Sequence, residues 1–158
     1  MPTAAIPMQD ASIDFSRTLV YPTRYGDVHL REDRLMSFAD GLFGFSDCTV
    51  FGLSKLPNVD SSPIMLLQCV NEPDIGFMVA DPTALGLTIK EEDRRAALKE
   101  TRMPAEDTQF LVILTMYDHG DGYYVTANMR APLLLDSTKR IGRQHILTNK
   151  AYSTQQKI

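Results

Sequence analysis

The sequence predicts an all-β protein, a small antiparallel β-barrel-like fold with one short helical insertion. Apolar stretches of about four to eight residues recur along the chain, and turn residues separate them every 8–12 residues or so. Only one segment has the composition of a helix. Neither a repeat nor a linker divides the 158 residues, so we expect a single domain.

The first strands are predicted after a polar N-terminal stretch. Residues 1–18 are rich in Pro, Ala and Ser, which predicts a flexible N-terminal arm before a β-barrel domain over residues 19–158. TRYGDVHLRE (23–32) then alternates with period two around a Gly-Asp, which indicates a hairpin or a bulged strand.

FADGLFGF (38–45) is expected to form a loop with its aromatic side chains, Phe45 included, pinned into a core. Gly41 and Gly44 punctuate it, and we expect positive φ or a close approach of neighbouring atoms at these two glycines.

The middle of the chain predicts three strands. TVFGLS (49–54) is a short one, and turn residues follow it. PIMLLQCV (63–70) and DIGFMVAD (74–81) are apolar runs joined by NEPD, which predicts two buried strands and a tight turn. Asp81 and Pro82 end the second of them.

The single helix is expected at about residues 90–100. Thr88 is a candidate cap, acidic residues occupy the first turn, and Arg94, Arg95 and Lys99 follow, an order that suits the helix dipole.

Two hairpins are expected to close the fold. QFLVILTMYD (109–118) and YYVTANMR (123–130) flank the turn DHGDG, and LLLD and RQHIL flank STKRIG. Pro132 has no N–H to donate, so it marks the start or edge of a strand, and Asn128 can bond a turn backbone.

The charge is acidic overall and uneven. The net charge is −4, yet residues 130–158 carry six Lys or Arg against one Asp, or +5. Residues 1–129 therefore hold −9. An acidic body of this kind attracts basic partners, and salt weakens the attraction.

The cysteines and the apolar runs indicate a cytoplasmic protein. Cys48 and Cys69 lie 21 residues apart without a CxxC, so we expect two buried thiols in a reducing compartment, with a disulfide or a metal site as the alternatives. The apolar runs are far shorter than the roughly 20 residues that cross a membrane, and the N-terminus lacks the pattern of a secretory signal.

The motifs do not indicate an enzyme or a cofactor. GLFG is not a phosphate loop, no GxSxG is present, and the three histidines are isolated in sequence. Asp118, His119 and Asp121 are more typical of a turn than of a metal site. An uncharacterised hydrolase remains one alternative, because clusters formed in space are invisible in a sequence.

A small barrel that binds single-stranded nucleic acid is the other alternative. STKRIGR supplies basic residues, and Tyr123, Tyr124 and Tyr152 could stack on bases. The pI of 5.3 argues against this function, since nucleic-acid-binding domains usually have a pI above about 9.

Four segments, in order, resemble the FliW family of bacterial flagellar assembly factors. They are TRYGDVHL, FADGLFGF, IGFMVADP and TANMRAPLLLD with RIGRQHIL. The residues that carry the family pattern are Gly41, Gly44, Phe45, Asp81, Pro82, Ala131 and Gln144. Asp136 departs from the pattern, because the family usually has Asn there, and His145 interrupts an aliphatic run.

The resemblance implies a non-enzymatic, cytoplasmic binding protein without a cofactor. Family members bind the translational repressor CsrA, which relieves the block on flagellin messenger RNA, and they hold newly made flagellin in a chaperone-like way. We therefore expect CsrA and flagellin as partners of a monomer that contacts neither nucleic acid directly nor a membrane.

The partner contacts are expected first at the acidic turn NEPD, through Glu72 and Asp74. The alternative is that NEPD is only a solvated hairpin turn. Asn128 and Pro132 are expected mainly to serve the fold, with a partner contact as the second possibility.

Overall fold

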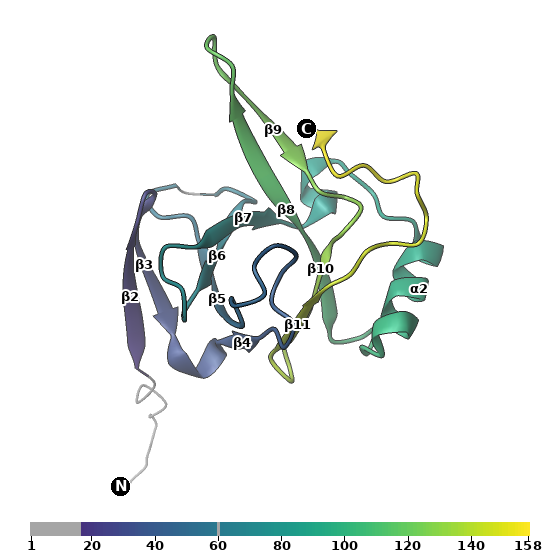
Figure 1. Ribbon diagram of the computed structural model, residues 1–158, viewed down its shortest axis with the longest axis horizontal. Helices are drawn as coiled ribbons and strands as arrows, with labels where there is room; N and C mark the ends of the chain where they lie inside the picture. The colour runs from purple at the N-terminus through teal and green to yellow at the C-terminus, as the bar shows by residue number, and fades with distance from the viewer. Residues whose placement is uncertain (1–16, 60) are drawn as a thin grey trace, which may run out of the picture.

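The computed structural model describes residues 17–59 and 61–158, which are mainly β-strands. One face is shown in Figure 1. The elements are β2 (Thr18–Thr23), β3 (Gly26–Arg31), η1 (Glu32–Arg34), β4 (Met36–Ser37), β5 (Val50–Lys55), β6 (Met65–Cys69), β7 (Gly76–Ala80), η2 (Pro82–Leu85), α2 (Glu91–Thr101), β8 (Thr108–Asp118), β9 (Tyr123–Ala127), β10 (Leu133–Asp136), β11 (Ile141–Gln144) and β12 (Gln156–Lys157).

Most strands join one sheet that closes on itself. The order is β10-β11-β4-β5-β6-β7-β8-β9-β12, and β10 also pairs with β8. The second pairing makes a ring of β4 to β8 with β10 and β11, antiparallel except where Ile141 of β11 meets Ser37 of β4. The predicted all-β barrel-like fold with one helix is confirmed.

Strand β8 has three partners along its length, β10, β7 and β9. Residues 108–111 pair with β10, whereas residues 114–118 pair with β9. Residues 112–114 pair with β7, so the ring uses β8 as far as Leu114, and the rest of the strand leaves the ring as a hairpin with β9, which projects at the top of Figure 1. The predicted turn at its tip is confirmed, because His119 N–H donates to the Gly122 carbonyl (3.1 Å).

The N-terminal hairpin β2–β3 lies beside the ring, and the hairpin predicted from period-two alternation is confirmed. Val28 and Leu30 of β3 pack with Leu66 of β6. The folded part begins earlier than expected, since Thr18 is already in β2 and the Arg17 carbonyl accepts from Glu32 N–H (2.8 Å). The rest of the expected arm, residues 1–16, lies outside the described residues.

The expectation that the aromatics of FADGLFGF are pinned into a core is only partly right. Phe38 is fully buried, but Phe43 and Phe45 are 56% and 39% exposed. The segment folds back through a bridge between Leu42 and Phe45, which turns the residues at its tip outward. Phe45 still packs the edge of its ring on Phe77, with centroids 5.0 Å apart.

The expected glycine conformations are confirmed in this loop. Gly41 and Gly44 have φ of 64° and 84°. A Cβ at Gly41 would also lie 2.5 Å from the Phe45 carbonyl oxygen, so both backbone freedom and lack of space require glycine there.

The helix α2 is confirmed, but Thr88 does not cap it. Lys90 is the N-cap and makes no side-chain capping bond. Its N–H instead donates to the hydroxyl of Tyr152 (2.9 Å), and that hydroxyl donates to Asp93 (2.6 Å). Burial, followed by the bond to Asp93, raises the pKa of Tyr152. The C-terminal segment therefore fastens the start of the helix. Among the described residues no helix is both long and apolar enough to span a membrane.

Cys48 and Cys69 are buried free thiols, as predicted. Burial, then the hydrogen bond with Cys69, raises the pKa of Cys48 to about 12. At pH 8 the thiolate share of Cys48 is then about 10⁻⁴, so we expect reaction with a disulfide reagent at least ~1,000-fold slower than for a free thiol. Absorbance of the released thiolate measures the rate, and the unfolded protein, in which both thiols should react quickly, is the control. Rapid labelling of the native protein would contradict the prediction.

Candidate functional site

The acidic turn NEPD, between β6 and β7, is fastened to the rest of the domain by its first residue. The side-chain oxygen of Asn71 accepts from the N–H groups of Thr49 (3.3 Å) and Val50 (3.2 Å). Its amide donates to the Asp47 carbonyl (2.6 Å). One side chain thus joins the turn to the loop that precedes β5.

A second clamp lies under the turn. Gln68 is 2% exposed, and its amide nitrogen donates to the carbonyls of Pro73 (2.8 Å) and Ile75 (3.1 Å) as well as to that of Cys69 (3.0 Å). The backbone of the turn is therefore held from both ends. Its conformation is fixed before any partner arrives.

The carboxylates of the turn are accessible to a partner. Glu72 and Asp74 are exposed, and neither takes part in an ion pair within the described part of the chain. Asp47 is exposed as well, and its charge and that of Glu72 both act on the thiol of Cys48. We call Asp47, Glu72 and Asp74 the acidic patch. Carboxylates that form no ion pair with a described residue favour the approach of a basic surface.

A cleft of about 350 Å³ borders the acidic patch. It separates Asp74 and Pro73 from the turn of the β2–β3 hairpin, where Arg24 and Tyr25 form the other wall. Asp74 therefore places one end of the acidic patch beside a hollow that a partner side chain could enter.

The family-pattern residues of the loops meet at Gln144. Its side-chain oxygen accepts from Phe43 N–H (2.9 Å), and its amide donates to the Ala131 carbonyl (3.1 Å). Asn128 accepts from Ala131 N–H (3.1 Å), so it bonds a turn backbone as predicted. Pro132 directly precedes β10, which confirms its predicted place at a strand start. These residues hold loops together, and a partner contact at Asn128 or Pro132 stays a prediction.

Asp81 and Pro82 of the pattern, and Asp136, which departs from it, end or shape turns. Asp81 accepts from Thr83 N–H (2.9 Å) and caps η2, in which Pro82 is buried, so the second apolar strand ends there as predicted. Asp136 is buried and accepts from the N–H groups of Thr138 (3.0 Å) and Lys139 (3.1 Å). Both bonds use Oδ1 of Asp136 as the acceptor, and the side-chain oxygen of an asparagine could accept them in the same way.

The basic and aromatic residues that suggested a nucleic-acid-binding site do not lie together. The turn of residues 137–140 lies at the bottom of Figure 1, opposite the tip of the β8–β9 hairpin that carries Tyr123 and Tyr124. Tyr124 stacks on Tyr117 (4.9 Å between centroids), and the hydroxyl of Tyr152 is engaged by Asp93. The structure therefore offers no shared surface for that combination.

The clamps Gln68 and Asn71 and the third acid Asp47 were not predicted from the sequence. A signal for Gln68 is present, because a Gln inside the apolar run PIMLLQCV must find buried partners. No comparable signal indicates Asp47, which reaches the turn only through the fold.

Comparison with known proteins gives a consistent result. The model of the FliW protein family matches residues 19–158. Similar sequences include the flagellar assembly factors FliW of Geobacillus kaustophilus, 34% identical over 138 residues (86% of this chain and 92% of the relative), and of Bacillus velezensis, 30% identical over 142 residues (89% and 96%).

A solved structure has the same fold. The crystal structure of a flagellar assembly factor FliW superposes with a TM-score of 0.67 at 30% sequence identity, and the match covers 89% of this chain and 96% of that one.

Proposed function

Because this chain belongs to the FliW family of flagellar assembly factors, we propose that it controls flagellin synthesis by binding two proteins, CsrA and flagellin. In this proposal it is a cytoplasmic regulator without catalytic activity. Binding to CsrA keeps that repressor away from flagellin messenger RNA. Unassembled flagellin competes for the protein, so its accumulation returns CsrA to the repressing state.

The acidic patch is the observation that carries the CsrA part of the proposal. A repressor that binds RNA must present basic surface, and a group of unpaired carboxylates is complementary to it. Such complementarity raises the association rate and selects the partner more than it adds affinity. The clamps at Gln68 and Asn71 reduce the entropy lost on binding, because the turn is already ordered.

Charge reversal of the turn is expected to weaken CsrA binding. Glu72→Lys with Asp74→Lys should raise the Kd at least about tenfold at low salt, and the difference should shrink as salt screens the charges. Titration calorimetry at two salt concentrations measures both effects. Glu92→Lys with Glu106→Lys is the matched control, since it changes the net charge equally at exposed positions elsewhere.

The proposed function can be tested independently of the role of the acidic patch. The purified protein is mixed with CsrA and with flagellin separately, and each mixture is run on a sizing column with light scattering. A stable complex with each is the expected result, and no complex with either would contradict the function. An unchanged CsrA affinity after reversal of Glu72 and Asp74 would contradict only the role of the acidic patch.

A further inference from the structure

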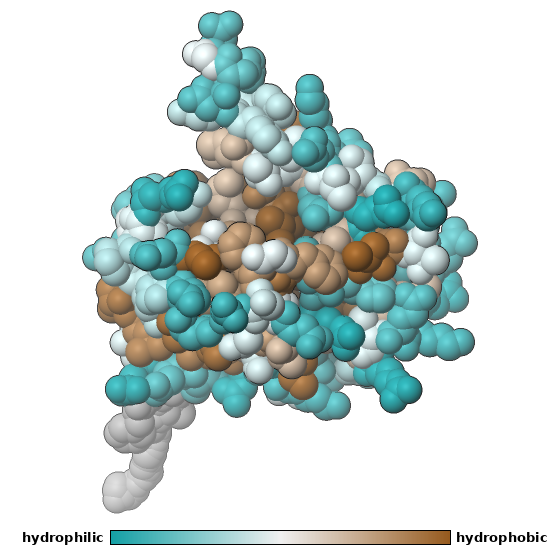
Figure 2. Space-filling model, in the orientation of Figure 1, coloured by the Kyte–Doolittle hydropathy of each residue, from teal (hydrophilic) through white to brown (hydrophobic). Residues whose placement is uncertain are grey.

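An apolar groove of about 510 Å³ lies between the 38–48 loop and β11, and no residue of the NEPD turn lines it. Its rim exposes three large apolar side chains, Phe43 (56%), Ile141 (45%) and Ile146 (53%). Figure 2 shows apolar residues gathered across the middle of this face. Grouped exposure of this kind marks a binding surface more often than isolated apolar residues do.

The groove continues toward the N-terminal end of the described chain. A second depression, of about 330 Å³, shares Ser37 with it and is lined by Glu32, Leu35, Lys139 and Arg140. The two hollows adjoin at Ser37, and together they are here called the channel, with η1 at one end and Ile146 at the other.

The channel is positively charged along its edge. Lys139 and Arg143 are exposed, and neither forms an ion pair with a described residue. Arg140 donates to the backbone carbonyl of Asp33. On the acidic side, Glu32 is paired with Arg17 (2.6 Å), which leaves Asp40 to oppose the cations. An occupant with apolar and acidic side chains is complementary to this surface.

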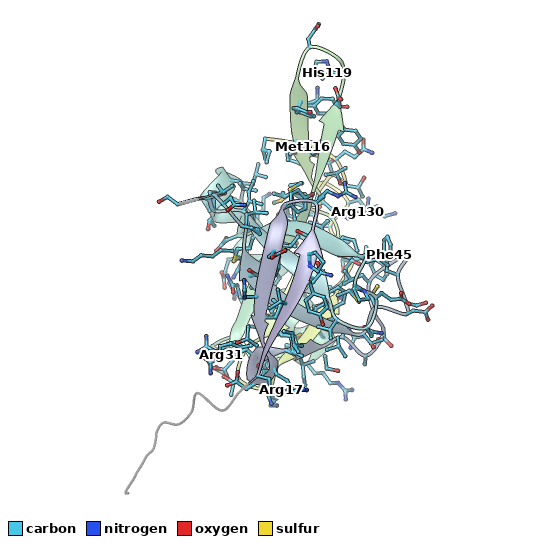
Figure 3. All side chains as sticks on the ribbon, turned by 90° about the vertical axis from the view of Figure 1, so that its left-hand side faces the viewer. Arg17, Arg31, Phe45, Met116, His119 and Arg130 are labelled. Carbon is cyan, nitrogen blue, oxygen red and sulfur yellow. The ribbon has the colours of Figure 1, made fainter. Side chains whose placement is uncertain are left out.

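Residues 1–16 have that chemistry, and they join the domain where the channel begins. The stretch contains Asp10 and Asp14, no Lys or Arg, and five larger apolar residues: Met1, Ile6, Met8, Ile13 and Phe15. Its connection is Arg17, whose guanidinium and carbonyl both bind Glu32, a lining residue of the channel. Figure 3 shows Arg17 at the lower end of the β2–β3 hairpin.

The length of the segment is sufficient. Sixteen extended residues span roughly 50 Å, whereas a compact domain of this size is on the order of 40 Å across. Tethering also helps, because a short linker gives an effective concentration in the millimolar range. An intrinsic Kd of about 0.1 mM would then keep the site roughly nine-tenths occupied.

We propose that residues 1–16 dock in the channel as an intramolecular ligand. Asp14 and Asp10 face the cationic edge at Lys139 and Arg143, and the apolar residues cover the groove. The family match begins at residue 19, so this device is an addition to the matched domain. Any protein that uses the groove must displace the segment, so its apparent Kd rises by the reciprocal of the unoccupied fraction, about tenfold at nine-tenths occupancy.

A single fluorophore tests the proposal in the full-length protein. The chain has no tryptophan, so Phe43→Trp places one reporter on the rim of the groove. Adding Asp10→Lys and Asp14→Lys should release the segment, shift the emission to longer wavelength and at least double the acrylamide quenching constant. Met116→Trp is the control, since Met116 is similarly exposed (48%) on the projecting hairpin, far from Arg17 in Figure 3.

Exchanging the charges of the two surfaces distinguishes docking of residues 1–16 from a general loosening of the domain. In the Phe43→Trp background, Lys139→Asp and Arg143→Asp should expose the reporter, and combining them with Asp10→Lys and Asp14→Lys should restore shielding. Identical quenching in all variants would overturn the proposal. Shielding that grows with protein concentration would overturn it in favour of a second copy, and shielding that appears only after CsrA or flagellin is added would assign the groove to that partner. The measurement needs no partner, so its failure leaves the proposed function standing.

Discussion

Replacing Gly142 with alanine is expected to lower the free energy of unfolding by about 3 kcal/mol, the upper end of overpacking effects. The added Cβ would overlap the ring of Phe38, which is fully buried in the centre of the barrel. The ring cannot retreat, because its edge already packs on Phe51 at 4.9 Å between centroids. For a domain of this size the loss corresponds to a fall in Tm of roughly 6–12 °C.

Denaturant unfolding of the two proteins checks this value. Gly120→Ala is the control, because Gly120 has a φ of 91° but open space around it, so only backbone strain is tested there. A second variant identifies the clash: Phe38→Leu should cost much less in the Gly142→Ala background than in the wild type, since the two residues are in contact. Unchanged stability of Gly142→Ala would contradict the packing described here.

Replacing Gln68 with methionine is expected to cost about 1–3 kcal/mol, because three carbonyls lose the Gln68 amide as a donor at nearly constant side-chain volume and only that of Ile75 is known to keep another donor, Cys69 N–H. The carbonyls are those of Cys69, Pro73 and Ile75. Since the turn then loses its lower clamp, amide hydrogen exchange should accelerate at Glu72 and Asp74 more than in the remaining strands.

The control for this change is Gln109→Met on β8, where the side chain is exposed and the effect should stay within about 0.5 kcal/mol. Exchange followed by mass spectrometry locates the loosening. A global loss of protection without a local excess at the turn would show that Gln68 supports the barrel as a whole and does not clamp the turn.

The strands with strong apolar patterns were predictable from the sequence. β6 and β7 flank NEPD as expected, and β8 and β9 flank DHGDG, because both pairs join neighbouring segments through turn residues. The short strands β4 and β12 have two residues each, and partners distant in sequence select them.

The failures share a physical cause. Thr88 is a good cap by type, yet the hydroxyl of Tyr152 reaches the helix start from 62 residues further along the chain. Phe43 is apolar, yet a reversal of four residues turns it outward. Local composition indicates which conformation or burial a residue favours. Its actual partners and the direction of its side chain depend on contacts that form only in the complete fold.

The closed ring has a consequence for the order of events during synthesis. Closure joins Ser37 to Ile141, and about 100 residues lie between them. At a translation rate of ~5–20 residues per second, the ribosome needs roughly 5–20 s to deliver the second partner after the first. Until then the edge of β4 that pairs with β11 is unpaired. During that interval the nascent protein avoids aggregation only if it stays soluble by itself or is bound by chaperones. A stalled or truncated chain would therefore expose an unsealed sheet, which is a target for proteolysis.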